Sequence, residues 1–110
     1  METNKNPKSL TIGHSEMDTI NNIIDIAVEA SGYSKEEILS NNRTRPLPAI
    51  RWFIGDKLVQ MGYSTSKAAK ILNINHATLL HGRKQIPSIS ERMGWKEELD
   101  ILTQFNALCK

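Results

Sequence analysis

The stretch TSKAAKILNINHATLLHGRKQI, residues 65–86, decides the fold expected of this chain. It divides into a short helical pattern up to Leu72, a three-residue break and a second helical pattern from His76. The small side chains of Ala68 and Ala69 would let two helices approach each other closely. This spacing predicts a helix-turn-helix, although an ordinary helical hairpin would show the same pattern.

The rest of the chain favours helices around this unit. Apolar side chains recur at helical spacing, and Pro and Gly are sparse, at 4 and 6 of 110 residues. Ser34 and Glu37 form a capping-box pattern, and Gly32 stands where the first helix would end. We expect helices over residues 16–31, 34–39, 48–61, 64–72 and 76–86, and a last one from about residue 90 or 95 to 108. The prediction is an all-α, compact five- or six-helix domain over residues 16–110, preceded by a flexible segment over residues 1–15.

Charge is divided unevenly along the chain. Residues 41–86 carry eight basic side chains and one acidic one, a net charge of +7. The remainder carries six basic and eleven acidic side chains, a net charge of −5. Such a concentrated basic block is typical of a surface that binds a polyanion. A solvated helix surface would also tolerate it, so charge alone leaves both interpretations open.

Side chains that suit base edges gather at the start of the second helix of the motif. In a helix-turn-helix this helix lies in the major groove of DNA and contacts bases through its N-terminal residues. Asn75 can cap the helix or pair with adenine, His76 can donate or accept at a purine edge, and Ala77 can pack on a thymine methyl. Thr78 and the free N–H groups of the first turn suit a phosphate. Three further residues could reach the DNA backbone: His81, Arg83 and Lys84.

The large apolar side chains are expected mainly in the interior. Leu79 and Leu80, with Ile86, are predicted to form the buried side of the second helix. We expect Trp52 in the core or in a dimer contact, with a ribose or phosphate contact as the alternative. Trp95 is expected to anchor the last helix.

Several classes of protein are disfavoured. No apolar run approaches the roughly 18 residues of a membrane span, and the first residues lack the apolar stretch of a signal peptide. Cys109 is the single cysteine and cannot form an internal disulfide, which favours a cytoplasmic protein. His76 and His81 are five residues apart and would not share a helix face as a zinc pair does. We expect no metal, no cofactor and no enzymatic activity.

Two motifs resemble DnaA, the bacterial chromosomal replication initiator. INHATLLH, residues 74–81, is similar to Arg-Asp-His-Thr-Thr-Val-Leu-His in the C-terminal DNA-binding domain of that family, domain IV, whose helical fold is related to the Trp repressor. ILSNNRTR, residues 38–45, is similar to the family's Leu-Leu-Ser-Lys-Arg-Arg-Ser-Arg. Arg51 stands where a further arginine opens the family's long third helix. The resemblance covers roughly residues 18–108, with the expected helices in the family's order.

The resemblance implies a role for each matching residue. Arg43, in the basic loop 41–46, would enter the minor groove, and Asn75, His76 and Ala77 would contact bases in the major groove. The positions associated with the sugar–phosphate backbone are Arg51, Thr78 and His81, to which charge and placement add Arg45, Lys70, Arg83 and Lys84.

The chain also departs from the family's pattern. Asn75 replaces an Asp, Ala77 a Thr and Ile74 an Arg, and Asn73 alone stands for a Gly-Gly pair. Asn both donates and accepts hydrogen bonds, whereas ionised Asp only accepts. We therefore expect DNA binding to survive with a preference other than the family's usual origin box. The chain has no phosphate-loop motif G-x-x-x-x-G-K-[ST], so ATP-driven strand opening is not expected of it.

The sequence thus predicts a stand-alone, non-enzymatic domain that binds double-stranded DNA and regulates transcription or replication. Phage and mobile-element factors fit this description, as do bacterial nucleoid-associated proteins. Neutralising about five phosphates would give a slope of log K against log salt near −4 to −5. The alternative is a protein-interaction adaptor that uses the same basic surface to hold an acidic partner. A homodimer or another protein partner stays open in both cases.

Overall fold

The computed structural model describes residues 12–109, with side chains from Glu16 onward. Its elements are α1 (Ile12–Ser31), α2 (Lys35–Leu39), α3 (Leu47–Gln60), α4 (Thr65–Ile71), α5 (His76–Gln85), the 3-10 turn η1 (Ile86–Glu91) and α6 (Lys96–Leu108). These residues contain no strand, so the all-α prediction is confirmed. The first helix begins at Ile12 rather than at residue 16. The rest of the segment expected to be flexible, residues 1–11, lies outside the described residues.

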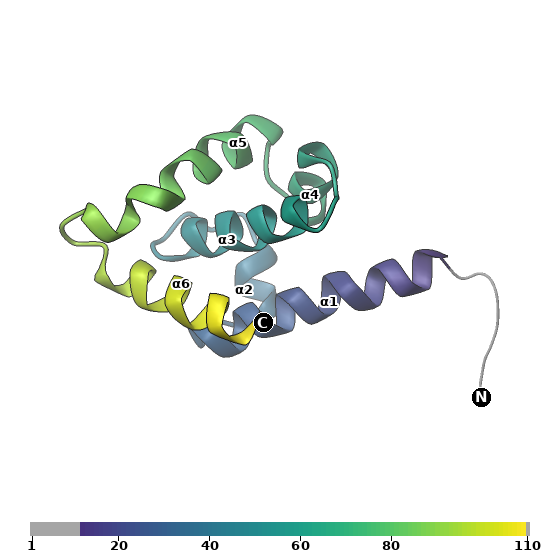
Figure 1. The fold of residues 1–110 in the computed structure, drawn as a ribbon, viewed down its shortest axis with the longest axis horizontal. Coiled ribbons are helices and arrows are strands. Elements are labelled where there is room, and N and C mark those ends of the chain that lie inside the picture. Colours follow the sequence, from purple (N-terminus) through teal and green to yellow (C-terminus); the bar gives the residue numbers. More distant parts are fainter. Residues whose placement is uncertain (1–11, 110) are drawn as a thin grey trace.

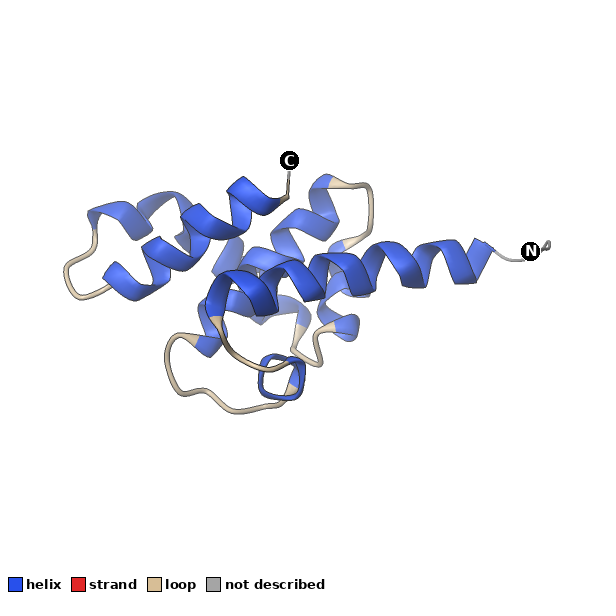
Figure 2. Ribbon diagram, turned by 90° about the horizontal axis from the view of Figure 1, so that it is seen from below, coloured by secondary structure: helices blue, strands red, loops and turns tan. Residues whose placement is uncertain are grey.

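Helix α3 lies at the centre of the domain. Helices α4 and α5 pack on one side of it, and α1 and α6 pack on the other side and against each other (Figure 1). The N-terminal part of α1 extends beyond the body of the domain in two perpendicular views (Figures 1 and 2). The long loop between α2 and α3 bulges from the body (Figure 2). This arrangement places the loop and α5 on either side of the N-terminal half of α3.

Aliphatic side chains build the core, as the composition predicts. The buried residues are Ile20, Ile23, Ile24, Ala27, Ile38, Leu47, Ala49, Ile50, Phe53, Ile54, Leu58, Ala68, Ala69, Leu72, Leu79, Ile89, Ile101 and Phe105. Burying one large aliphatic side chain stabilises the fold by about 1.5–3 kcal/mol. The prediction for Leu80 is wrong, because its side chain is 39% exposed whereas that of Leu79 is fully buried. None of the helices within residues 12–109 is both long and apolar enough to cross a membrane.

The predicted helix boundaries rest on local hydrogen bonds. The capping box is present, with the Glu37 N–H donating to Ser34 Oγ at 3.1 Å and the Ser34 N–H donating to Glu37 Oε1 at 3.0 Å. Gly32, just past the end of α1, has a φ of 78°, a left-handed conformation that glycine adopts without strain. Ser64 caps α4 by accepting from the Lys67 N–H at 3.1 Å.

Two glycines let α5 lie close to α3. A Cβ atom on Gly55 of α3 would overlap the end of the Leu79 side chain. A Cβ atom on Gly82 of α5 would overlap the Trp52 indole. The close approach of the two helices therefore depends on the missing side chains at these two positions, and it fixes where the exposed face of α5 lies.

Candidate functional site

A cleft of about 340 Å³ separates the loop between α2 and α3 from the start of α5. Its walls come from the loop (Asn41, Arg43), from α3 (Pro48, Arg51, Trp52), and from the turn and first residues of the α4–α5 unit (Asn73, Ile74, Asn75, Thr78). The cleft therefore brings Arg43 and Asn75, which are far apart in the sequence, to one surface.

The α4–α5 unit has a tight turn that orients α5. Asn73 adopts a φ of 59°, a left-handed conformation that Asn tolerates better than most residues. The Ile74 N–H donates to the Ala69 carbonyl at 3.0 Å and closes the turn over α4. Asn75 then caps α5, because its Oδ1 accepts from the Ala77 N–H at 2.7 Å. Of the two roles open to Asn75 in the sequence, the free protein uses capping, and the side-chain NH₂ group remains as a donor at the surface.

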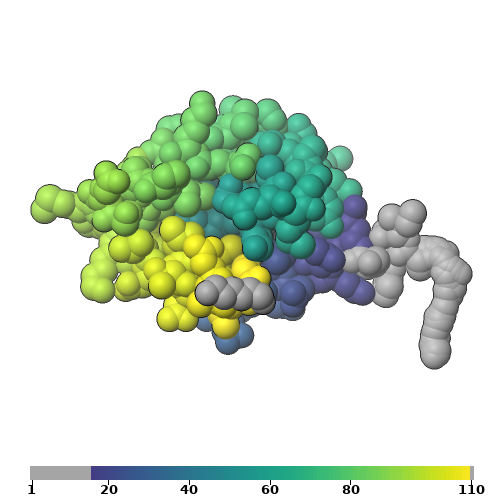
Figure 3. Space-filling model, in the orientation of Figure 1, coloured from purple at the N-terminus to yellow at the C-terminus, as the bar shows by residue number. Residues whose placement is uncertain are grey.

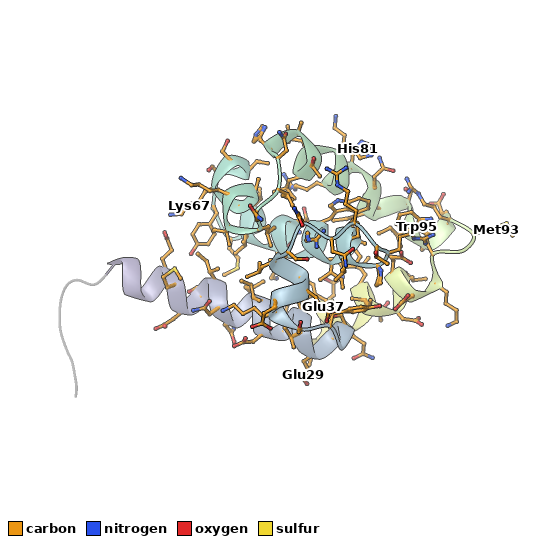
Figure 4. All side chains as sticks on the ribbon, turned by 180° about the vertical axis from the view of Figure 1, so that it is seen from behind. Glu29, Glu37, Lys67, His81, Met93 and Trp95 are labelled. Carbon is orange, nitrogen blue, oxygen red and sulfur yellow. The ribbon has the colours of Figure 1, made fainter. Side chains whose placement is uncertain are left out.

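One face of α5 is turned outward, away from α3. The exposed side chains are His76, Ala77, Thr78, Leu80, His81 and Lys84, whereas Leu79 and Gly82 face the interior. The surfaces of α5 and the neighbouring α4 form the upper side of the molecule in Figure 3. His81 lies on this side of the molecule in Figure 4. The outward face of α5 therefore combines polar side chains with one large apolar side chain, Leu80, that the sequence placed inside.

Arg51 is buried, with 3% of its surface exposed. Its Nε–H donates to the Ile38 carbonyl at 2.7 Å, and Nη2 donates to the Glu37 carbonyl at 3.2 Å. Both carbonyls lie at the end of α2, where the next helical turn is missing, and the Glu37 carbonyl also accepts from the Ser40 N–H and hydroxyl. Burial lowers the pKa of Arg51. The guanidinium therefore holds the end of α2 beside the cleft, which Arg51 also lines, and its expected contact with the sugar–phosphate backbone stays a prediction.

Arg45 is held by the start of α6. Its Nε–H donates to Glu98 Oε2 at 2.8 Å, and Nη2 donates to the Gly94 carbonyl at 2.8 Å. The guanidinium also lies 4.3 Å from the centroid of the Trp95 ring. The hydrogen bond to Glu98 raises the pKa of Arg45. Arg45 therefore joins the loop to α6 in the free protein, a role that the sequence did not predict for it.

Arg83 is also paired within the chain. Its Nε–H donates to Asp56 Oδ1 at 2.8 Å, which joins α5 to α3. Lys67 pairs with Glu16 at 2.5 Å. Within the basic block of residues 41–86, Arg43, Lys70 and Lys84 are exposed and form no ion pair. These three are the exposed cations of the block that remain available to an anion.

Two tryptophans connect the cleft with α6. Trp52 and Trp95 stack with ring centroids 6.2 Å apart and ring planes 19° apart. Trp52 lies in the cleft wall and packs over Gly82 of α5. Trp95, at the N-cap position of α6, is partly buried against the core as expected. Trp52 is thus packed against the core, as one of the two alternatives predicts, and its contact with a ribose or phosphate stays a prediction.

The described residues contain no group of three or more His, Cys, Asp and Glu side chains that could hold a metal ion.

No known protein family model matches the chain, and no characterised protein matches it in sequence. The resemblance to DnaA domain IV therefore rests on the motifs at residues 38–45 and 74–81. The cleft lies between these two motifs.

Sequence reasoning missed several residues of the cleft. Asn41 and Asn73 line it, but their side chains give no signal beyond turn propensity. Glu98 was indistinguishable from its neighbour Glu97, because both stand in the first turn of α6. Only the tertiary fold shows that Glu98 is buried and paired with the loop.

Proposed function

We propose that this chain binds double-stranded DNA, with the start of α5 in the major groove and loop 41–46 in the neighbouring minor groove. The observation that carries the proposal is the shared cleft, because Arg43 and Asn75 line its two sides. In B-DNA, one sugar–phosphate strand separates neighbouring grooves, and the major and minor grooves are about 12 and 6 Å wide. The cleft would hold that strand, with Asn41, Asn73 and Thr78 offering polar groups to it.

The outward face of α5 supplies the contacts to bases. His76 and Ala77, exposed at its first turn, would contact base edges, and the free NH₂ group of Asn75 would donate to an acceptor. Leu80 stands one helical turn after Ala77 on the same face and is 39% exposed. These two apolar side chains favour a site that presents thymine methyl groups in the major groove.

The electrostatic contribution is smaller than the sequence predicts. Arg45, Arg51 and Arg83 are committed to partners within the chain. The exposed and unpaired cations near this face are Arg43, Lys70 and Lys84. Neutralising about three phosphates would give a slope of log K against log salt near −3, in place of −4 to −5. Thr78 and His81 would add neutral hydrogen bonds to the backbone, which the salt slope does not report.

The proposed activity is recognition without chemistry. A cytoplasmic domain that resembles DnaA domain IV would regulate transcription or replication by occupying its site, in a bacterial, phage or mobile-element setting. The described residues include no group of His, Cys, Asp and Glu side chains that could hold a metal ion. Nothing in the proposed mechanism requires a cofactor or an enzymatic step.

Selection of bound duplexes from a random pool, followed by fluorescence anisotropy, tests the proposal. Arg43→Ala and His76→Ala should each weaken binding to the selected duplex by roughly 1–3 kcal/mol, and should affect a scrambled duplex less. Lys57→Ala is the matched control, because Lys57 lies on the side of α3 that faces α6 and Cys109. It should leave both affinities nearly unchanged.

The opposite results have clear meanings. Equal losses on both duplexes for His76→Ala would remove His76 from the base contacts. Failure of the wild-type chain to bind any duplex at moderate salt would overturn the proposal and favour an adaptor that holds an acidic protein partner.

A further inference from the structure

A cluster of four side chains, Arg45, Trp52, Trp95 and Glu98, joins the two elements proposed to contact DNA. We propose that Glu98 acts through Arg45 as a positioning residue that sets loop 41–46 for the minor groove. This inference rests on the proposed DNA binding. It assigns a function to the start of α6, which lies outside the helix-turn-helix and outside the basic loop.

Glu98 is a carboxylate with 2% of its surface exposed. Its Oε2 accepts from the Arg45 Nε–H at 2.8 Å, and the Arg45 side chain is 52% exposed. Removing one partner from a buried ion pair leaves an uncompensated charge and is strongly destabilising. Glu98 therefore resists the release of Arg45 to a phosphate. The second hydrogen bond of Arg45, to the Gly94 carbonyl at 2.8 Å, fixes the plane of the guanidinium.

The aromatic half of the cluster extends this fixation to α5. The guanidinium groups of Arg45 and Arg92 lie over the Trp95 ring, 4.3 and 5.0 Å from its centroid, and Trp95 stacks with Trp52. Trp52 in turn packs over Gly82 of α5. Figure 4 shows Trp95 near Met93, at a height between those of His81 on α5 and Glu37 on α2. The cluster thus fixes the loop relative to α5, and this separation must match the distance between neighbouring grooves.

The nearly isosteric change Glu98→Gln, which removes the carboxylate charge, separates positioning from direct contact. If Arg45 contacted a phosphate, loss of its competing carboxylate would free a cation and tighten binding. If Glu98 positions the loop, the same change loosens the loop and weakens binding. Reordering one loop residue on the duplex costs about 1–2 kcal/mol, which corresponds to roughly a tenfold loss of affinity.

The experiment measures binding of Glu98→Gln, Arg45→Ala and the double variant to the selected duplex and to a duplex with altered base pairs under the loop. Each single variant should lose about tenfold on the selected duplex and little on the altered one, and the double variant should lose no more than either. The salt slope should stay unchanged. Glu91→Gln is the control, because it makes the same charge change at an exposed site and should match the wild type.

Two outcomes would overturn the proposal. Tighter binding by Glu98→Gln would do so, and so would a fall in the magnitude of the salt slope by about 0.9 in Arg45→Ala, the change expected for one lost phosphate contact. Arg45→Lys provides a second variant that keeps the charge but loses the forked geometry, and it should behave like Arg45→Ala if positioning is the role.

Hydrogen exchange of the free protein keeps this proposal distinguishable from the proposed function. Glu98→Gln should accelerate exchange of loop amides such as that of Thr44, which donates to Asn42 Oδ1 at 2.8 Å, while α1 amides stay protected. Unchanged loop exchange would refute the positioning role even if the wild-type chain binds DNA. A loop that loosens in a chain that binds no duplex would instead place the failure in the proposed DNA binding.

Discussion

Gly82→Ala should destabilise the domain, although alanine is the better helix former. In the interior of an exposed helix, replacing Gly by Ala stabilises by about 1 kcal/mol. In this structure the new Cβ would overlap three atoms of the Trp52 indole, Cδ1, Cγ and Nε1. These atoms belong to a rigid ring that is stacked on Trp95, and not to the free end of a flexible chain.

The magnitude follows from the competition between these two effects. Overpacking of a well-packed site costs about 1–3 kcal/mol, and the upper part of that range applies where a stacked ring must move. After the gain in helix propensity, the free energy of unfolding should fall by about 1–2 kcal/mol. For a domain of this size, that loss lowers Tm by roughly 5–15 °C.

Thermal and urea unfolding, followed by far-UV circular dichroism, measure the loss of stability. Near-UV dichroism reports the displacement of the tryptophan pair. Gln104→Gly and Gln104→Ala, at an exposed site of α6, give the propensity difference without a packing effect. A Gly82→Ala variant at least as stable as the wild type, with an unchanged near-UV spectrum, would show that Trp52 does not need the missing side chain at position 82 in order to pack.

Three further predictions test the packing, a cap and a thiol. Leu79→Ala should lower the free energy of unfolding by about 2–5 kcal/mol, whereas Leu80→Ala should change it by less than about 1 kcal/mol. Losses of similar size for the two variants in urea unfolding would contradict the observed orientation of α5. Ser34→Ala should cost about 1 kcal/mol through loss of the capping box, and a neutral result in the same assay would show that α2 is held by its tertiary contacts alone. Burial raises the pKa of the Cys109 thiol above its ordinary 9.0, so the unfolded chain loses this proton first as the pH rises. The contribution to stability is then complete below pH 9 and declines above it, and Cys109→Ala should show a weaker fall in stability between pH 8 and pH 10 than the wild type.

Local patterns were sufficient for most of the secondary structure. Ser34 and Glu37 predict a capping box because they are three residues apart. Gly32 predicts a helix end because glycine adopts a positive φ without strain, and the structure shows this φ. Helices α4 and α5 and the turn between them follow from spacing in the same way. The direction of Leu80 was wrong because successive residues of an α-helix are 100° apart, so two adjacent leucines cannot both point at the centre of the same interface. Leu79 is the buried leucine because it stands seven residues, close to two helical turns, before Ile86 and therefore lies on the same side as that residue.

Long-range pairing explains why the candidate site was predicted less well than the fold. Sequence reasoning treats a run of arginines as an exposed cationic surface. Arg45 instead pairs with Glu98, 53 residues later in the chain, and Arg83 pairs with Asp56, 27 residues earlier. Arg51 finds no carboxylate and satisfies carbonyls of α2. No local pattern separates these three from Arg43, which stands in the same basic block and lies at the cleft.

The use of these arginines inside the fold changes what kind of DNA binding the basic block can support. With about five phosphate contacts, raising the salt concentration from 50 to 200 mM would weaken binding by about 500-fold, whereas three contacts give a loss of about 40-fold. Fewer phosphate contacts also weaken binding to random sequence, which depends almost wholly on this effect. Selectivity then depends on the contacts made from the two sides of the cleft. In the proposed complex those contacts would work together only at a fixed separation. The link between Arg45 and the buried Glu98 would then contribute more to recognition than Arg45 would as one more surface charge.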